Sequence, residues 1–195
     1  MILCAGDIET FPYATPIGVG LCAATTNCTR LAMMTPPEFF LFIGTAGSYG
    51  HYRPLDIVES KAASQIELSY LLKKSYTPLP NNLIVSDPDV SRETPLETIA
   101  HSKHPVIVNS SNYITTDMNV AKRFNRLGIG LENMEFYAVM HVAQQFGIPC
   151  GGIFVVTNFC DENAHDDFMT HRLEGMQKLT FYLQERIPNL EAIHS

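Results

Sequence analysis

The sequence has few basic residues and no cluster of them. Its 195 residues include 13 Lys and Arg against 20 Asp and Glu, so the formal net charge is −7. Proteins that bind nucleic acid or an anionic bilayer need clustered cationic side chains to meet the phosphate groups. We therefore expect neither a nucleic-acid partner nor a membrane partner.

Long apolar runs and metal-binding patterns are also missing. No apolar run reaches the roughly 18 residues that a membrane helix needs. The opening residues MILCAGDIET carry no basic leader, so the cytoplasm is the compartment we expect. The five cysteines form no CxxC pair, and the His, Cys, Asp and Glu residues lack the spacing of metal ligands. We predict reduced core thiols, no metal and no cofactor.

Apolar residues, in contrast, are abundant. They make up 46% of the chain against 17% charged residues, enough to bury a core, and the length suits one domain over residues 1–195. There is no internal repeat or linker, and the stretch from Thr77 to Asn82 is typical of a surface loop.

Strand-like and helix-like segments alternate along the chain, which predicts an α/β fold with a largely parallel sheet. We expect strands at Ile2 to Ala5, Phe39 to Gly44, Leu83 to Ser86, Pro105 to Asn109 and Gly152 to Thr157. We expect helices at Gly20 to Met34, Pro95 to Ser102, Asp117 to Leu127, Met134 to Phe146 and Asp166 to Arg186. In the fourth helix, the residues Phe136, Val139, Met140, Ala143 and Phe146 follow helical spacing and should face the core.

Ligands of open α/β sheets bind beyond the carboxyl ends of the strands. Five polar segments occupy such places: Gly6 to Glu9, Gly44 to Ser48, Ser110 to Tyr113, Asn133 to Glu135, and Thr157 with Asn158. Together they predict a polar, aromatic and acidic rim around a ligand.

The glycine-rich segment Gly44 to Ser48 allows two interpretations. Its backbone amides and the Thr45 hydroxyl could cradle an anion or a sugar. Since the segment lacks both the Lys of a P-loop and dinucleotide-site spacing, an ordinary turn is the favoured alternative on the residues alone. The Gly18-Val19-Gly20 turn is equally unspecific.

Three further residues are ambiguous by themselves. Glu135 at the start of an apolar helix is either a residue that stabilises the helix dipole or a ligand for vicinal hydroxyls. Met134 would otherwise be a gap-filling core residue, and Tyr113 an ordinary core or rim aromatic.

These segments, in this order, resemble bacterial methylthioadenosine/S-adenosylhomocysteine nucleosidases of the nucleoside phosphorylase and nucleosidase superfamily. The stretch GVGLCAATTNCTRLAMMTPPEFFLFIGTAGS from Gly18 to Ser48 is similar to the family segment that ends in the GSAG loop. Asp56 to Val58, Asn112 to Ile114, the Met134-Glu135 pair and Ala138 to Asn158 then follow the family pattern. The resemblance covers roughly four fifths of the chain.

The resemblance implies a three-layer α/β/α fold with a central mixed, largely parallel sheet, shortened near the N-terminus between Phe11 and Ile17. It also implies roles for individual residues: Glu135 and Met134 hold the ribose, while Tyr113, Ile114 and Asn158 contact the base. Cleavage passes through an oxocarbenium-like sugar cation, which a carboxylate such as Glu135 would stabilise.

Asn158 departs from the family pattern, because it stands where these nucleosidases carry the Asp that protonates N7 of adenine. An amide cannot be that acid, but its carbonyl can accept from N7–H while its NH2 donates to a 6-oxo group. This favours hypoxanthine or guanine, although Asn can also pair with N6 and N7 of adenine.

The phosphate site departs as well. Phe42 and Thr10 stand where the hexameric phosphorylases have phosphate-binding arginines, so Gly18, Gly20, Gly44 and Thr45 remain as the candidate loop contacts. Phosphate is an optional co-substrate and water the other nucleophile. Glu9 and Asp7 are the candidate bases, unless both only satisfy loop amides.

Two functions follow. The first is an enzyme that cleaves a purine nucleoside, with a 6-oxopurine preferred, by phosphorolysis or hydrolysis; the second is a weakened relative that only binds a purine or nucleoside. The family also implies a homo-oligomer. Fold alone does not establish turnover.

Overall fold

The computed structural model describes residues 1–79, 83–85, 106–187 and 190. Its elements, in chain order, are β1 (Ile2–Cys4), β2 (Thr15–Pro16), α1 (Leu21–Met34), β3 (Phe40–Ser48), β4 (Ile57–Ser60), β5 (Ala62–Ser64), α2 (Leu68–Leu71), β6 (Leu83–Val85), β7 (Ile107–Ser110), α4 (Met118–Arg126), β8 (Ile129–Asn133), α5 (Phe136–Phe146), β9 (Cys150–Phe159) and α6 (Ala164–Gln184).

The nine strands within the described residues form one mixed sheet. One path through it runs β2-β1-β3-β8-β7-β5-β6, while β9 pairs with the other edge of β3 and carries β4 on its far side. The pairs β1–β2, β1–β3, β3–β9, β7–β8 and β5–β7 are parallel, and β3–β8, β4–β9 and β5–β6 are antiparallel. The expected mixed, largely parallel sheet is confirmed.

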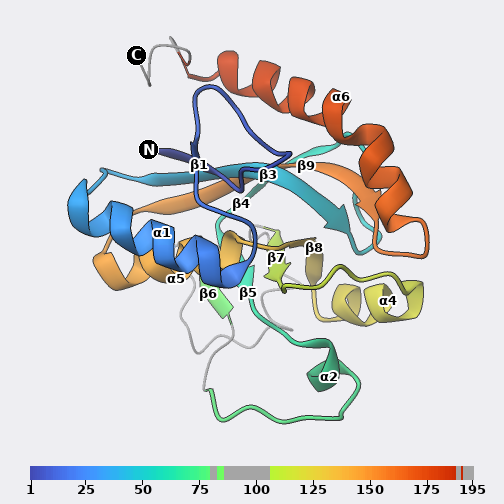
Figure 1. Ribbon diagram of the computed structural model, residues 1–195. Coiled ribbons are helices and arrows are strands. Elements are labelled where there is room, and N and C mark those ends of the chain that lie inside the picture. Colours follow the sequence, from blue (N-terminus) through green and yellow to red (C-terminus); the bar gives the residue numbers. More distant parts are fainter. Residues whose placement is uncertain (80–82, 86–105, 188–189, 191–195) are drawn as a thin grey trace.

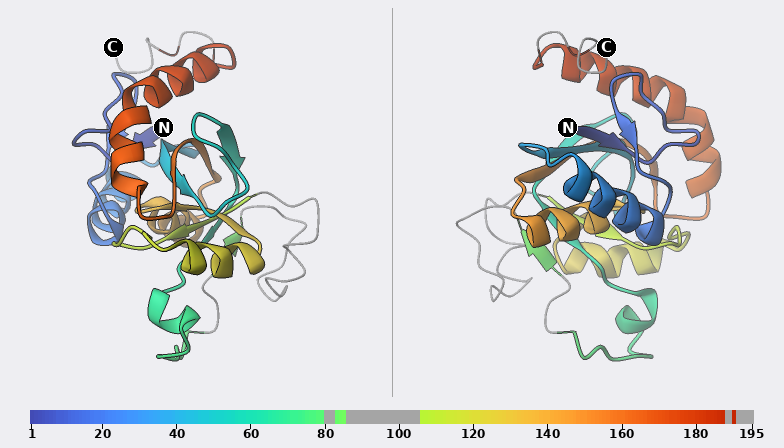
Figure 2. Two further views of the ribbon diagram at one scale, coloured as in Figure 1. Left: turned by 90° about the vertical axis from the view of Figure 1, so that its right-hand side faces the viewer. Right: turned by 60° about the vertical axis from the view of Figure 1, so that its left-hand side comes forward.

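Helices cover both faces of the central strands. In Figures 1 and 2, α6 lies along one side of β1, β3 and β9, while α1 and α5 lie side by side on the other. Because successive strand residues point to opposite faces, Phe42 packs into the cluster beneath α1 and α5, and Ile43 into the cluster beneath α6. The three-layer α/β/α arrangement expected from the sequence is therefore present.

Local sequence sets several helix ends. The Asp117 carboxylate accepts from the amides of Asn119 at 2.7 Å and Val120 at 3.4 Å and so begins α4. Asn133 Oδ1 accepts from the amides of Glu135 and Phe136, both at 2.9 Å, ahead of α5. The same helix ends at Gly147, whose left-handed conformation (φ 67°, ψ 26°) closes the last turn.

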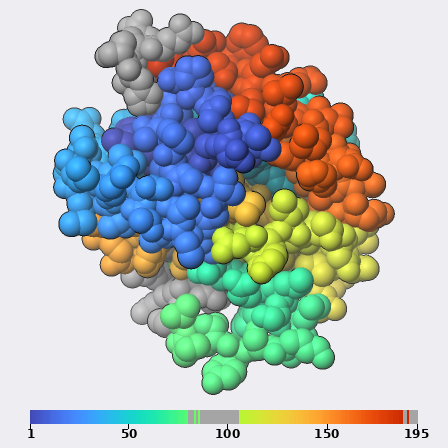
Figure 3. Space-filling view, viewed as in Figure 1, coloured from blue at the N-terminus to red at the C-terminus, as the bar shows by residue number. Residues whose placement is uncertain are grey.

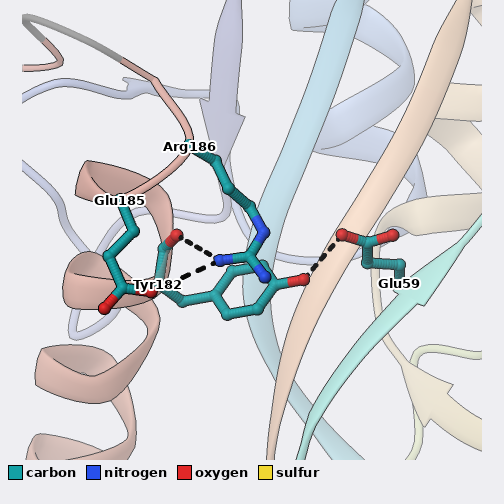
Figure 4. A network of polar contacts seen from close by, with 4 residues as sticks. All are labelled: Glu59, Tyr182, Glu185 and Arg186. Carbon is teal, nitrogen blue, oxygen red and sulfur yellow. Dashed lines mark hydrogen bonds and ion pairs between the residues drawn. The ribbon is translucent and has the colours of Figure 1, made fainter.

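The C-terminal end of α6 is attached to strand β4. Tyr182 Oη donates to Glu59 Oε1 at 2.7 Å, and the Arg186 guanidinium carbon lies 3.5 Å from the centre of the Tyr182 ring (Figure 4). Arg186 also donates to the Tyr182 carbonyl at 3.2 Å and lies 3.6 Å from the Glu185 carboxylate. These contacts hold the C-terminal end of α6 against strand β4.

Most predicted elements are present, with shifts at their ends. The expected strands correspond to β1, β3, β6, β7 and β9, and the expected helices to α1, α4, α5 and α6. Strand β4 falls on the segment Asp56 to Val58, which the resemblance matched to a family strand. Four elements were not predicted: β2, β5, β8 and α2. The expected helix over Pro95 to Ser102 lies outside the described residues. Between Phe11 and Ile17, where the chain was expected to be short, the structure has only the two-residue β2.

Two sequence interpretations need correction. Phe146 was assigned to the core face of α5, but 44% of it is exposed because it lies in the last turn. Cys22 is exposed on α1, whereas the other four cysteines are buried, and all five are free.

The segment Gly44 to Ser48 is neither a loop nor a turn: it is the second half of the nine-residue strand β3. Gly44 lets neighbouring side chains approach the strand closely and does not reverse the chain. A Cβ at this position would stand 3.2 Å from Phe42 Cε1 and 3.3 Å from Glu9 Oε2.

The edge of β3 passes from one neighbour to another along its length. Its first part pairs with β1 at Leu41 and Phe42, and its last residues pair with β8 at Gly47 and Ser48. A register shift in the β3–β9 pairing between Ala46 and Gly47 marks the same place. Between the end of β1 and the end of β8 the sheet therefore leaves a crevice, the position where open α/β sheets bind ligands.

Candidate active site

A cavity of about 280 Å³ occupies this crevice. Its walls come from the segment after β1, the end of β3, the segment after β7, the end of β8 and the first turns of α6. Three of these segments meet on the face shown in Figure 3: the N-terminal residues in blue, the yellow-green region after β7, and the orange beginning of α6.

The structure brings most predicted site residues to this cavity. Lining it are Asp7, Glu9, Thr45, Tyr113, Ile114, Met134, Glu135 and Asn158. Gly18, Gly20 and Gly44 stand behind the wall and do not line it.

Glu135 is a buried carboxylate at the entrance to α5. Only 2% of the residue is exposed, and Oε1 accepts from the Gly20 amide at 2.8 Å. Glu135 occupies the N-cap position of α5 but makes no side-chain capping bond. Stabilisation of the helix dipole therefore does not explain why its carboxylate points toward Gly20. Burial and the nearby Glu9 charge raise its pKa to about 7, although hydrogen bonds from Gly20 and neighbouring groups oppose the shift.

Glu9 reaches the cavity from a tight turn. Gly6 and Glu9 exchange backbone hydrogen bonds of 3.3 and 2.9 Å, with Gly6 at φ 96° and Asp7 at φ 55°. The turn aims the Glu9 carboxylate at Thr45, whose amide donates at 2.9 Å and whose hydroxyl donates at 2.7 Å. Burial raises the pKa of Glu9, and the Thr45 hydrogen bonds and the Arg172 charge lower it less. Asp7, at the tip of the turn, is exposed.

The Glu9 contacts argue against an anion cradle at Gly44 and Thr45, the less favoured of the two interpretations of this segment. An anion cradle needs backbone amides that point at the ligand, but the Thr45 amide and hydroxyl are both turned to a carboxylate of the protein. Phe42, at the position of a phosphate-binding arginine in the hexameric phosphorylases, is fully buried and packs against Phe136 and Phe154.

Gly18 and Gly20 instead shape the turn before α1. Gly20 has φ 86° and ψ 166°, a conformation that is essentially confined to glycine. Its amide is the donor to Glu135, and the next amide, of Leu21, donates to Asn112 Oδ1 at 2.9 Å. The turn therefore orients the carboxylate of Glu135.

Asn158 lies at the end of β9, with 5% of the residue exposed. Its Oδ1 accepts from Thr157 Oγ1 at 2.9 Å and its Nδ2 donates to the Phe159 carbonyl at 2.9 Å. An amide offers two N–H groups and two lone pairs, so one donor and one acceptor remain for a ligand.

The aromatic and apolar members of the site lie nearer its mouth. Tyr113 is 82% exposed and Ile114 is 54% exposed, and both follow β7 on the segment that the Leu21–Asn112 hydrogen bond ties to α1. Phe168 and His165, on the first turns of α6, face the cavity from the other side.

Sequence analysis included Asn133 in the rim segment Asn133 to Glu135, but it missed other lining residues, among them Glu132 and Phe168. Glu132 belongs to β8, a strand that was not predicted. A carboxylate in a short apolar run, two residues before the Met134-Glu135 pair, was the signal that could have found it. Phe168 was identified only as part of the expected helix from Asp166 to Arg186.

Within the described ranges, no group of three or more His, Cys, Asp and Glu side chains could hold a metal ion. Nor is any helix of that part of the chain long and apolar enough to cross a membrane.

Comparisons with known proteins agree with this architecture. The sequence profile described as the phosphorylase superfamily matches residues 3–185. Among curated proteins, no sequence matches.

Solved structures are similar over nearly the whole chain. A 5′-methylthioadenosine/S-adenosylhomocysteine nucleosidase from Helicobacter pylori has a TM-score of 0.74 at 17% identity and covers 94% of this chain and 95% of its own. A structure described as futalosine hydrolase of the same organism has a TM-score of 0.74 at 17% identity, with coverages of 94% and 94%. The nucleosidase of S. pneumoniae has a TM-score of 0.71 at 13% identity, with 98% of each chain covered. At these identities the likeness shows the fold.

Proposed function

The chain belongs to the phosphorylase superfamily, and from that premise we propose that it hydrolyses the N-glycosidic bond of a purine nucleoside, with a 6-oxopurine as the preferred base. The observation that carries the proposal is the pair of carboxyl groups, Glu9 and Glu135, that line one cavity, where burial and the charge of Glu9 raise the pKa of Glu135. Such a pair suits a reaction in which positive charge develops on the sugar.

Each carboxylate has a separate task in this proposal. Glu135 accepts hydrogen bonds from the ribose 2′ and 3′ hydroxyls, with Met134 against the apolar face of the sugar. Glu9 accepts a proton from a water molecule whose oxygen bonds to C1′. The electron pair of the C1′–N9 bond leaves with the base, which takes one proton from the solvent at N7, and Asn158 donates to O6 and accepts from that N7–H. Glu9 returns its proton to the solvent. The products are ribose and the free purine.

Water is favoured over phosphate by the surroundings of Glu9. The Glu9 carboxylate accepts hydrogen bonds from the Thr45 amide and hydroxyl, which a phosphate group would otherwise use. Phe42 supplies no positive charge at the position of the phosphorylase arginine. A phosphate ion would meet negative charge where the phosphorylases supply arginine.

The first prediction follows from these roles. Glu135→Gln should keep the fold and lower kcat/KM by two or more orders of magnitude, about 3 kcal/mol of transition-state stabilisation. The assay is base release from inosine, guanosine, adenosine, 5′-methylthioadenosine and futalosine, each with and without phosphate.

Free ribose as product and a rate independent of phosphate are expected. Saturable phosphate dependence with ribose 1-phosphate as product would contradict hydrolysis. Ligand binding without base release would indicate a purine-binding protein. Activity of Glu135→Gln within a few-fold of wild type would remove Glu135 from the site.

A further inference from the structure

Strand β9 contains a bulge where it reaches the cavity. Its register against β3 shifts between Ala46 and Gly47, and Thr157 is the extra residue on β9. The pairing of β9 with its other neighbour, β4, ends earlier, at Val155. A bulge bends a strand and redirects the side chains beside it, and bulges are frequent next to active sites. The residue that directly follows this one is Asn158.

Helix α6 packs closely against the bulge (Figure 1). Gly175 of α6 makes room for the strand, because a Cβ there would stand 3.2 Å from both methyl groups of Val155 and 3.7 Å from Thr157 Cγ2. One helical turn earlier, His171 Nδ1 lies 2.9 Å from the Thr157 carbonyl oxygen and 2.9 Å from the Asp167 carbonyl oxygen.

These two contacts determine where the His171 ring carries its hydrogen. A carbonyl oxygen can only accept a hydrogen bond, so Nδ1 must be the donor and must share its hydrogen between both carbonyls. Asp167 lies in the first turn of α6, next to Phe168, which lines the cavity. One ring therefore joins the helical wall of the cavity to the end of β9.

The orientation of the bulge is passed on to Asn158. The carbonyl that His171 binds belongs to the peptide group between Thr157 and Asn158, so rotation of that group would change the direction in which the Asn158 side chain leaves the strand. The Thr157 hydroxyl also donates to Asn158 Oδ1 at 2.9 Å. Both residues are buried, and a buried carbonyl that loses its donor is costly. Loss of the His171 donor should therefore move the bulge.

We propose that His171 is a positioning residue for Asn158: its Nδ1–H holds the Thr157 carbonyl and so sets the direction in which the Asn158 amide meets the base. His171 is not among the residues that line the cavity, so its effect reaches a ligand through the strand. This inference rests on the proposed function, because it assumes that Asn158 contacts a purine base.

The test compares two replacements of equal shape. His171→Asn places an amide nitrogen as many bonds from the backbone as the imidazole Nδ1, whereas His171→Leu has the same shape without a donor. His171→Leu should weaken hypoxanthine binding in isothermal calorimetry and lower kcat/KM for inosine, each by roughly tenfold, because a contact group displaced by about 1 Å can cost up to a hundredfold. His171→Asn keeps the donor and should restore both quantities to within about threefold of wild type. Leucine is the better helix former, so a weaker helix cannot explain the loss.

A double-mutant cycle with Asn158→Ala separates positioning from a merely structural role. If His171 acts through Asn158, removal of the amide also removes the effect of His171. His171→Leu should then change hypoxanthine affinity and kcat/KM for inosine by less than about twofold in the Asn158→Ala background. The kinetic value covers the case in which binding to these variants is too weak for calorimetry.

Thr170→Val is the matched control on the same helix. The exposed Thr170 hydroxyl donates to the Asp166 carbonyl at 2.8 Å within α6, so the variant loses a side-chain hydrogen bond without a change at β9. Hypoxanthine affinity should stay within about twofold of wild type, since the variant leaves the Thr157 carbonyl with its donor.

Three results overturn the inference: no loss in His171→Leu, an equal loss in His171→Asn, or a loss of the same size in the Asn158→Ala background. Should His171→Leu fail to fold, His171→Gln carries its amide one methylene further from the backbone and should show the same loss. Failure of the proposed function is distinguishable. Wild-type protein that releases no base removes the hydrolysis, yet hypoxanthine calorimetry still decides the role of His171. Wild-type protein that neither releases base nor binds hypoxanthine overturns both.

Discussion

In the proposed function, Asn158 contributes to base choice through the donor and the acceptor that its hydrogen bonds leave free. Because Nδ2 donates to the Phe159 carbonyl and Oδ1 accepts from Thr157, the amide is locked in one orientation. A 6-oxopurine meets its free donor and acceptor, whereas the 6-amino group of adenine, in the same pose, presents a donor to a donor.

Asn158→Asp should shift the preference toward 6-aminopurines. The new carboxyl group would face the Phe159 carbonyl in place of an N–H, which favours its protonated form and supplies an acid for N7. The measurement is the ratio of kcat/KM for inosine and adenosine, which reports differential transition-state binding. Asn158→Ala, the control, should lower both rates. A ratio unmoved by Asn158→Asp would mean that other residues choose the base.

Arg172 is a cation that the sequence did not bring to the site. Its Nε is buried and has no hydrogen-bond partner among the described residues, and its guanidinium carbon lies 6.0 Å from the centre of the Phe168 ring. Its charge lowers the pKa of Glu9, against the larger effect of burial. Arg172 thereby helps to keep the proposed base ionised.

Arg172→Met should move the acidic limb of the pH profile of kcat/KM to higher pH. Glu9 must be deprotonated to accept a proton from water, and without the cation its pKa rises further. Arg30→Met, on the exposed side of α1, should leave the profile unchanged. If the acidic limb of the pH profile does not shift in Arg172→Met, a group other than Glu9 determines that limb.

The turn into α1 is the element whose geometry matters most for Glu135. Its amides at Gly20 and Leu21 point to Glu135 and Asn112, and no side chain caps the helix. The helix start is thereby attached to Glu135 and to the segment after β7, which the proposed function assigns to the sugar and to the base.

Gly20→Ala should lower kcat/KM at least tenfold and destabilise the protein by about 1–3 kcal/mol. A Cβ there would sit 2.9 Å from Asn112 Oδ1 at φ 86°, so the turn must move and the Glu135 hydrogen bond weakens. Gly147→Ala is the control: it also has positive φ, but nothing lies within 4 Å. It should reduce the melting temperature without reducing kcat/KM. Equal loss of kcat/KM in both variants would contradict this role of the turn.

The elements that sequence could predict are those with strong local patterns. The apolar spacing of α5 and the long buried runs of β3 and β9 identify them without tertiary information. Strands β5 and β8 escaped because they are short, and their polar or small residues, such as Glu132 and Ser64, are stabilised by partners distant in sequence. Glycines indicated a loop in β3 because close approach and chain reversal favour the same residue.

The same limit applied to the site. Individual residues such as Glu135 and Asn158 followed from an ordered resemblance, and the structure places them at one cavity. That Glu9 would turn back onto Thr45 depended on a tight turn and on strand order, which no local pattern contains. Arg172 and Glu132 gain importance only from their neighbours across the sheet.

Across the whole molecule, three buried carboxyl groups favour stability at lower pH. Burial raises the pKa values of Glu9, Glu132 and Glu135. When the folded pKa lies above the unfolded one, ionisation opposes folding, so this cost is present above the folded pKa and disappears as pH falls toward the unfolded value. The functional site therefore reduces stability at neutral and alkaline pH.

Glu135→Gln should consequently stabilise the ligand-free protein at pH 8 by up to roughly 3 kcal/mol, because the ionised Glu135 is lost. The gain should shrink as pH falls through 7 and vanish below about 4.5. Urea unfolding at several pH values measures it, with exposed Glu174→Gln as the control that shows no such trend. A variant less stable than wild type at pH 8 would contradict this interpretation of the buried charge.

The expected homo-oligomer stays a prediction, which light scattering of the purified protein can check.

Because burial and the charge of Glu9 raise the pKa of Glu135 to about 7, the ligand-free cavity also binds and releases a proton near neutral pH. Near neutral pH a proton on this pair offsets the charge that a sugar cation would otherwise meet. A positively charged ribose mimic must therefore displace that proton into the solvent as it binds. Its apparent enthalpy of binding then includes the ionisation enthalpy of the buffer, and its affinity increases with pH until the pair is fully ionised. The cavity exchanges one positive charge for another.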